Sequence, residues 1–242
     1  MEKSEVPSST SSDTPRSKRP SDNAVLEDPS KPKVQLPAEV LAPFHDENLL
    51  NDLHDTESEQ SRRLHGFFAV LGLCHTALAA EVSPGVIEYK AQSPDEAALV
   101  QAAADVGFVF LGLDKNIMRL RTPFSDDPEE YELLNVLEFN STRKRMSVIL
   151  RKLDEDGRIF LLCKGADNII FERLRSGNEE VKQKTDSDLQ YFASEGLRTL
   201  CLAYKIVEED EYAKWAKAYH EASVALENRE DKVEEVSESI EK

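Results

Sequence analysis

The sequence lacks any uncharged run long enough to cross a bilayer. Its longest such run, GFFAVLGLCHTALAA at residues 66–80, contains His75 and Thr76. A membrane-spanning helix needs about 20 predominantly apolar residues. We therefore expect this run to belong to a buried core helix. Residues 1–20 are polar throughout, so we expect no signal peptide.

Cysteine is also scarce, with 3 residues in the whole chain. Cys74, Cys163 and Cys201 are odd in number, lie far apart and form no C-x-x-C pair. This pattern excludes a disulfide framework and predicts unpaired thiols packed in the core of a protein from a reducing compartment. The 5 histidines show no metal-ligand spacing, so no metal site is predicted.

Basic residues are in the minority. The chain has 30 Lys and Arg against 47 Asp and Glu, a formal net charge of -17. Such a charge repels phosphate backbones and anionic lipid headgroups, so we expect no nucleic-acid partner. The sequence also lacks G-x-x-x-x-G-K-[ST], which excludes a Walker-type phosphate cradle. A small anionic ligand would need cations gathered locally.

The chain divides by composition into a tail and one domain. Residues 1–37 are rich in Ser, Pro and Lys and poor in large apolar residues, which predicts a disordered tail or linker. Residues 38–242 carry the periodic patterns of a folded domain. Helices are expected at about 56–80, 95–106, 166–174 and 178–194, and from about 209 onward. Strands are expected at 86–91, 108–113, 117–122, 131–139, 145–153, 158–164 and 198–207.

Short hairpin connections separate most of these strands. They predict an α+β fold with a twisted, mainly antiparallel β-sheet flanked by helices.

The segment SPDE at residues 93–96 has two interpretations. Ser93 followed three residues later by Glu96 is a capping box, and Pro94 fits the first helical position. Alternatively, the Glu96 carboxylate points outward to a ligand while Ser93 caps the helix alone. Local chemistry favours the capping box.

Four motifs occur in a fixed order along the chain: SPDEAALV (93–100), LEFNSTRKRMSVI (137–149), LLCKGADNII (161–170) and EGLRTLCLAY (195–204). Each is weak alone, but the set of four is highly specific. Together they resemble the nucleotide-binding (N) domain of P-type ATPases, in particular the type IV phospholipid flippases and most closely their fungal members. The resemblance covers roughly residues 38–242.

The resemblance assigns residues to the base of a bound ATP. It implies that Phe139 stacks on adenine, although periodicity alone favours core packing for this ring. Ser141 would lie beside it as a polar contact. Glu96 aligns with the acid that meets the adenine amino group, and Lys144 aligns with a basic residue near the nucleotide. The alternative for the whole TRKRM run (142–146) is a solvated turn with snorkelling side chains, in which Arg143 and Arg145 share one face.

Two further cations are assigned to the nucleotide, Arg198 to the phosphates and Lys164 to the phosphates or to the edge of the base ring. Lys164 ends a very apolar strand and must reach water or an anion, and Gly165 after it permits close backbone approach. Arg198 follows Gly196 at the start of a buried strand, where its guanidinium can clamp phosphate oxygens or form a salt bridge to a nearby acid. Thr199 is a lesser contact.

The resemblance implies a cytosolic ATP-binding domain of a multi-pass membrane protein at the plasma membrane or the Golgi and endosomal membranes. In the full-length enzyme, ATP with Mg²⁺ would be presented to an aspartate in a separate domain, driving phospholipid translocation. Partners would be the phosphorylation and actuator domains of the same polypeptide and an accessory membrane subunit. The Asp-Lys-Thr-Gly-Thr motif of the acceptor is absent here, so we expect no turnover by this chain alone.

Two alternatives stand beside this hypothesis. One is the N domain of a cation-transporting P-type ATPase, against which SPDEAA and EFNSTRKRM argue. The other is an acidic, non-catalytic interaction module that docks a partner through its last helix.

Overall fold

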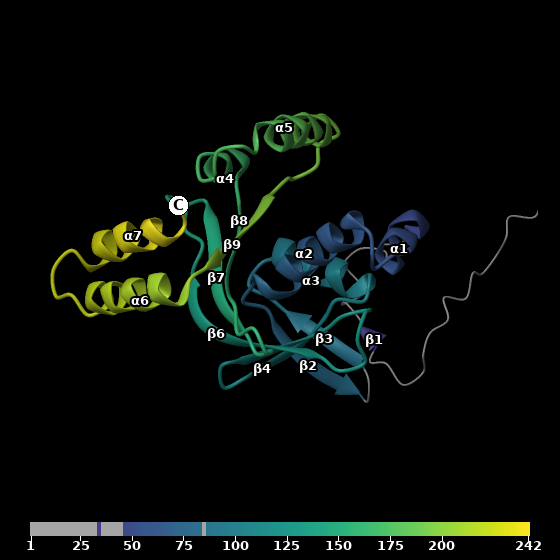
Figure 1. Cartoon of the computed structure of the whole chain (residues 1–242), viewed down its shortest axis with the longest axis horizontal. Helices are drawn as coiled ribbons and strands as arrows, with labels where there is room; N and C mark the ends of the chain where they lie inside the picture. Colours follow the sequence, from purple (N-terminus) through teal and green to yellow (C-terminus); the bar gives the residue numbers. More distant parts are fainter. Residues whose placement is uncertain (1–32, 35–45, 84–85) are drawn as a thin grey trace, which may run out of the picture. The chain divides into compact units, whose positions relative to one another are not determined.

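The computed structural model describes residues 33–34, 46–83 and 86–242 (Figure 1). The helices are α1 (Glu47–His54), α2 (Glu59–Leu73), α3 (Pro94–Asp105), α4 (Asp167–Phe171), α5 (Glu179–Ser194), α6 (Glu209–Ser223) and α7 (Arg229–Ile240). The strands are β1 (Lys33–Val34), β2 (Leu78–Ser83), β3 (Val86–Lys90), β4 (Val109–Asp114), β5 (Ile117–Arg121), β6 (Glu129–Leu137), β7 (Arg145–Lys152), β8 (Ile159–Gly165) and β9 (Cys201–Val207).

The strands form two sheets. A 3-stranded sheet has the order β1-β3-β2, and a 6-stranded sheet has the order β4-β5-β6-β7-β8-β9. Every neighbouring pair is antiparallel except β1 with β3. Strands consecutive in sequence are therefore neighbours in the larger sheet, through short connections from β4 to β8 and through α4 and α5 between β8 and β9. The predicted α+β class with a mainly antiparallel sheet is confirmed.

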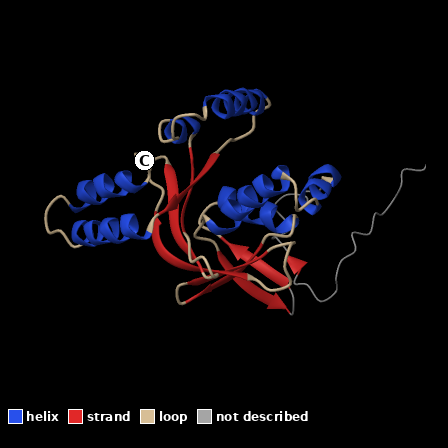
Figure 2. Ribbon diagram, viewed as in Figure 1, coloured by secondary structure: helices blue, strands red, loops and turns tan. Residues whose placement is uncertain are grey.

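Helices cover both faces of the larger sheet (Figures 1 and 2). Helices α2 and α3 lie on one side, and α6 and α7 lie on the other. Strand β7 shows why, because its side chains alternate: Val148 and Leu150 pack with α2 and α3, whereas Ile149 packs with Trp215 of α6 and Ile240 of α7. The core thus has two parts, one on each face of the sheet.

Helix α3 ends as its sequence predicts. Gly107 has a φ of +97°, which a residue with a side chain rarely adopts. Its N–H donates to the Ala104 carbonyl (3.0 Å), and the Phe108 N–H donates to the Ala103 carbonyl (2.9 Å). These two bonds form a Schellman motif, and they direct the chain from α3 straight into β4.

Several predicted boundaries are wrong. The helix expected over 56–80 ends at Leu73, and Leu78–Ser83 forms β2, because this segment pairs with β3. Apolar composition alone does not separate a buried helix end from a buried strand. The last helix is two helices, separated near Val224 and restarted at Asn228 with a φ of +52°. Strand β6 ends two residues before Phe139.

The prediction of a disordered tail over residues 1–37 falls outside the described residues, apart from Lys33–Val34 in β1. Within the described ranges, no helix is long and apolar enough to cross a membrane.

The three cysteines are unpaired and buried, which confirms their predicted role in the core. Burial raises the pKa of the Cys74 thiol to about 12 and that of the Cys163 thiol to about 11. Thiols with such pKa values stay protonated at neutral pH and are poor nucleophiles.

Candidate functional site

The Glu96 carboxylate does not close a capping box. Ser93 Oγ accepts the Glu96 N–H (3.1 Å) and so caps α3. The carboxylate itself accepts from the Thr76 N–H (3.0 Å) and from Thr76 Oγ (3.2 Å). Ser93 therefore caps the helix alone, and Glu96 is directed away from the cap toward the segment that follows α2.

Lys164, the second-last residue of β8, forms an ion pair with Glu96. Its Nζ lies 3.5 Å from Glu96 Oε1, and each side chain is only 11% exposed. Lys164 is two residues after Leu162 in the strand, so the two side chains point to the same face of the sheet. Leu162 packs in the core on the face covered by α2 and α3. Two motifs that are distant in sequence thus meet on the α2–α3 face of the sheet.

Gly165 is required by the neighbouring strand. A Cβ at this position would lie 2.7 Å from the Lys144 carbonyl oxygen and 2.6 Å from Arg145 Cβ. The close approach at Gly165 is thus made by the neighbouring chain at Lys144 and Arg145, and the expected approach of an anion to this glycine stays a prediction. The Ala166 N–H donates to the same Lys144 carbonyl (3.0 Å), which joins the second motif to the third.

Phe139 lies on the turn between β6 and β7, and its ring is 62% exposed. The core-packing alternative for this ring is therefore wrong. Ser141 and Lys144 are exposed on the same turn. Asn140 organises the turn, because its Oδ1 accepts from the Arg143 N–H (2.7 Å) and its carbonyl accepts from the Lys144 N–H (2.8 Å).

Arg143 and Arg145 do not lie in a solvated turn, so that alternative is wrong as well. Both side chains are buried, and both donate to the carboxylate of Glu241 at the end of α7. They share one face, as strand alternation predicted, and Lys144 between them is exposed. Sequence reasoning missed Glu241; the spacing of glutamates along α7 was the available signal.

Arg198 lies in the loop between α5 and β9, since β9 begins only at Cys201. Its Nη1 is 2.5 Å from Oδ2 of Asp95 at the start of α3, and its side chain is 84% exposed. This is the salt bridge that stood as the alternative to a phosphate contact. Thr199 is half-buried in the same loop. The pair places the fourth motif beside the first.

His75 is buried next to Thr76, the residue that binds the Glu96 carboxylate. Its Nδ1 accepts the Ala77 N–H (3.1 Å), so its Nε2 carries the proton that bonds the Gly72 carbonyl (2.9 Å). Burial, with Lys164 adding to it, lowers the pKa of His75 from 6.5 to about 4. His75 is therefore uncharged at physiological pH.

Acidification should therefore destabilise the domain through His75. Unfolded His75 takes up a proton near pH 6.5, whereas folded His75 does so only near pH 4. Stability from this group is full above pH 6.5 and falls as the pH drops toward 4. We expect a loss of about 2 kcal/mol between pH 6.5 and about pH 5, measured by urea unfolding.

His75→Asn should flatten this pH dependence. Burial also lowers the pKa of His65, so His65→Gln is the matched control and should keep the part of the slope due to His75. A full slope in His75→Asn would show that another group is responsible.

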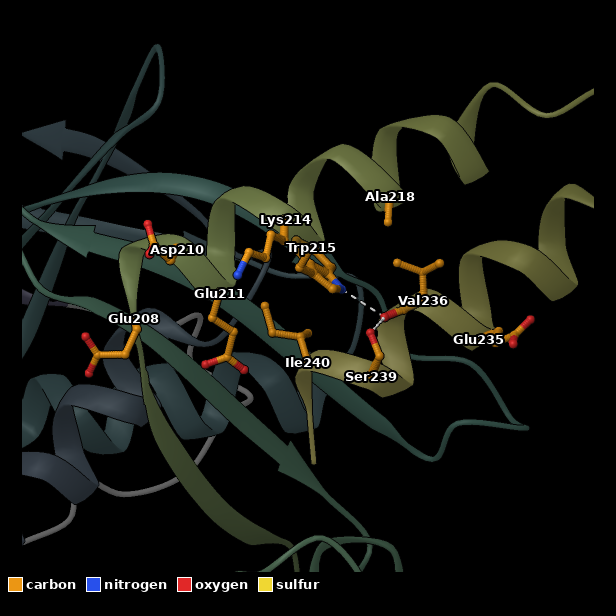
Figure 3. A pocket seen from close by; sticks show the side chains of 10 residues that line it. All are labelled: Glu208, Asp210, Glu211, Lys214, Trp215, Ala218, Glu235, Val236, Ser239 and Ile240. Carbon is orange, nitrogen blue, oxygen red and sulfur yellow. Dashed lines mark hydrogen bonds between the residues drawn. The ribbon is translucent and has the colours of Figure 1, made fainter.

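A hollow of the described residues lies elsewhere, between α6 and α7 (Figure 3). It measures about 710 Å³, with Trp215, Val236 and Ile240 among its lining residues. Its other lining residues are Glu208, Asp210, Glu211, Lys214, Ala218, Glu235 and Ser239. Carboxylates outnumber the single lysine, so an anionic ligand would be repelled here. Among the described residues, no group of three His, Cys, Asp or Glu side chains is placed to hold a metal ion.

Comparison with known proteins gives one family and a group of relatives. The family model for the P-type ATPase cytoplasmic domain N matches residues 63–241. "Phospholipid-transporting ATPase DRS2" of Saccharomyces cerevisiae is 44% identical over 196 residues, covering 81% of this chain and 14% of that protein. "Phospholipid-transporting ATPase dnf2" of Schizosaccharomyces pombe is 48% identical over 184 residues, covering 76% and 13%. Human "Phospholipid-transporting ATPase ID" is 45% identical over 183 residues, covering 73% and 14%. The chain thus spans only a small fraction of the length of these relatives.

Proposed function

The chain belongs to the family of P-type ATPase cytoplasmic N domains, and we propose that it is the ATP-binding domain of a type IV, phospholipid-transporting member. Family membership confirms the resemblance drawn from the four motifs. The named relatives at 44–48% identity are phospholipid-transporting enzymes, which favours this class over a cation pump.

One observation carries the assignment to ATP. The four motifs, which are scattered over the sequence, are linked at one end of the larger sheet: Glu96 to Lys164, Asp95 to Arg198, and the Lys144 carbonyl to Ala166. An acidic interaction module has no need for such a gathering of cations. The exposed Phe139 lies on the same β6–β7 turn as Lys144.

We assign the base to Phe139, Ser141 and Glu96. An exposed ring next to a polar turn suits adenine stacking, and a carboxylate oxygen can accept from the adenine amino group. Glu96 retains this capacity while it bonds Thr76, because each carboxylate oxygen has two lone pairs.

We assign Lys144 and Arg198 to the phosphates, with Thr199 as a lesser contact, and Lys164 to the phosphates or to the edge of the adenine ring. Lys164 is the least exposed of the three cations and is held in place by Glu96, so it is preorganised. On ATP binding, Arg198 leaves Asp95 and contacts phosphate oxygens instead. The Arg198–Asp95 pair can break because an exposed ion pair is weak.

In the full-length enzyme, the domain presents the terminal phosphate of Mg²⁺-bound ATP to an aspartate in a separate domain. Mg²⁺ neutralises charge on the phosphates, and this chain supplies binding and orientation of the nucleotide. The phosphorylation and actuator domains of the same polypeptide and an accessory membrane subunit are the partners. The domain itself faces the cytosol from a multi-pass membrane protein at the plasma membrane or at Golgi and endosomal membranes.

Titration of the isotope-labelled chain with ATP tests this proposal. We expect amide shifts near Phe139 and Lys164, none in α6 and α7, and a dissociation constant of about 0.1 to several millimolar, because one stacked base and a few exposed cations bind weakly. Mg²⁺ should change this affinity little. Unmoved amides around Phe139, or sub-micromolar binding that requires Mg²⁺, would refute the proposed site.

Glu96→Gln should reduce the preference for ATP over GTP by about threefold to tenfold. The amide weakens acceptance from the adenine amino group. Ser93 Oγ still accepts the backbone N–H of residue 96, so the helix cap is retained. Affinities for both nucleotides are measured by calorimetry.

Ser93→Ala is the matched control for that substitution. It removes the cap, lowering stability by about 1 kcal/mol, and leaves the carboxylate in place, so the nucleotide preference should be unchanged. If Glu96→Gln and Ser93→Ala behave alike, Glu96 has only a structural role.

A further inference from the structure

We infer that Glu241 is a positioning residue for nucleotide binding, acting through Arg143 and Arg145 on the turn that carries Lys144. Glu241 itself lies on the α6–α7 face of the sheet, away from the candidate site. This inference rests on the proposed function of the turn, and it adds a residue that none of the four motifs contains.

The Glu241 carboxylate is saturated with donors. Its Oε1 accepts from Arg143 Nη2 (2.6 Å) and Ser147 Oγ (2.5 Å), and its Oε2 accepts from Arg145 Nε (2.8 Å) and Arg145 Nη2 (2.5 Å). The side chain is 2% exposed. Charge-assisted bonds of this number fix the two guanidiniums in one geometry. Both arginines are therefore directed to α7 and away from phosphate.

Two further glutamates of α7 complete the cluster. Glu234 lies 3.3 Å from Arg143 Nη1, and Glu238 pairs with Arg173 and lies 3.6 Å from Arg145 Nη2. Counting Glu241, three carboxylates face three guanidiniums, and the Lys242 ammonium also lies 3.4 Å from Glu238 Oε2. A cluster paired in this way holds its arginines firmly.

Lys144 sits between the two anchored arginines in an unusual backbone conformation. Its φ is +52°, which is uncommon and unfavourable for a residue with a side chain. The Lys144 N–H donates to the Asn140 carbonyl (2.8 Å), and the Lys144 carbonyl accepts from the Ala166 N–H (3.0 Å). With both neighbours anchored on one side, Lys144 is held exposed on the turn that carries Phe139.

A simpler role for Glu241 would be to fasten α7 to the sheet. That role can be separated, because a second contact fastens the same end of α7 without touching the turn. Lys205 Nζ donates to the carbonyls of Ile240 (3.2 Å) and Lys242 (2.9 Å). Lys205→Met therefore loosens α7 and leaves Arg143 and Arg145 paired.

The experiment is a double-mutant cycle on ATP affinity at a temperature where every variant is folded. We expect Glu241→Gln to weaken ATP binding about tenfold, the size of one lost charge-assisted contact, and Lys144→Ala to do the same. In the Lys144→Ala background, Glu241→Gln should weaken ATP binding further by less than about twofold, because both substitutions act through the Lys144 side chain. Lys205→Met should weaken binding less than about twofold at matched stability. The amide chemical shifts of residues 141–145 should differ from those of the unsubstituted protein in Glu241→Gln and should be unchanged in Lys205→Met.

Three results would overturn the inference: equal losses from Glu241→Gln in both backgrounds, no loss from Lys144→Ala, or a tenfold loss from Lys205→Met. If Glu241→Gln does not fold, Ser147→Ala replaces it in the cycle. Ser147→Ala should weaken ATP binding about threefold, and this loss should be absent in the Lys144→Ala background. Phe139→Ala is the reference variant. If it leaves ATP affinity intact, the proposed function fails; if it weakens binding while the cycle is additive, only the role of Glu241 fails.

Discussion

Glu241→Ala is expected to lower the free energy of unfolding by about 3–5 kcal/mol. The substitution leaves Arg143 and Arg145 buried, 4% and 2% exposed, without the carboxylate that both of them bind. It also leaves the Ser147 hydroxyl without its acceptor. Removal of one partner from a buried ion pair is more destabilising than the pair is stabilising, because an uncompensated charge remains. Urea unfolding at neutral pH measures the loss.

Glu235→Ala is the matched control for this substitution. Glu235 is an exposed glutamate of the same helix, so its loss should change stability by no more than about 0.5 kcal/mol. A loss below about 1 kcal/mol for Glu241→Ala would mean that Glu234 and Glu238 can replace it as partners of the two arginines.

Most strands and most helices could be predicted because local rules determine them. In β7 the apolar run alternates between two faces that are both covered, and Gly107 stops α3 where a left-handed residue is needed. These features depend on neighbours in sequence. The predicted α+β class and the mainly antiparallel pairing of the sheet followed from them.

The boundary errors have a physical cause in pairing between distant segments. Residues 78–80 read as the end of a helix, yet β3 supplies a partner strand and the chain pairs with it. Likewise the basic run 142–146 looks solvated in sequence, because nothing local shows that α7 will bring a carboxylate onto Arg143 and Arg145. Tertiary contacts override local propensity in both places.

The glutamates of α7 show how much of that cluster the sequence contained. Glu234, Glu238 and Glu241 follow one helical face, which marks a stripe able to meet cations. Helix α7 carries other acids, such as Glu230 and Asp231, so the stripe is not distinctive. Only the fold identifies which acids are buried.

The sequence predicts which residues belong to the candidate site better than it predicts how they are arranged. Lys164 was expected to need an anion, and it has one in Glu96, a residue assigned separately to the base. The sequence gives no sign that the two would pair, because their motifs lie on different elements, α3 and β8.

Phe139→Ala should weaken the binding of ATP, ADP and AMP by similar factors, about 5- to 150-fold, which corresponds to the loss of one base stack. The ring is 62% exposed, so its removal takes little apolar surface out of the core. We therefore expect the free energy of unfolding to change by less than about 0.5 kcal/mol. Calorimetric titration of the three nucleotides measures the effect.

Two variants control for the ring itself and for exposed aromatics in general. Phe139→Tyr keeps a stacking face and should keep most of the affinity, whereas Phe192→Ala removes another exposed ring, on α5, and should change nothing. The uniform loss across ATP, ADP and AMP is the informative part, because a residue that acts on phosphate would lose its effect as phosphates are removed. A loss from Phe139→Ala that shrinks from ATP to AMP would place the ring beside the phosphates and would reverse the orientation of the nucleotide in the proposed site.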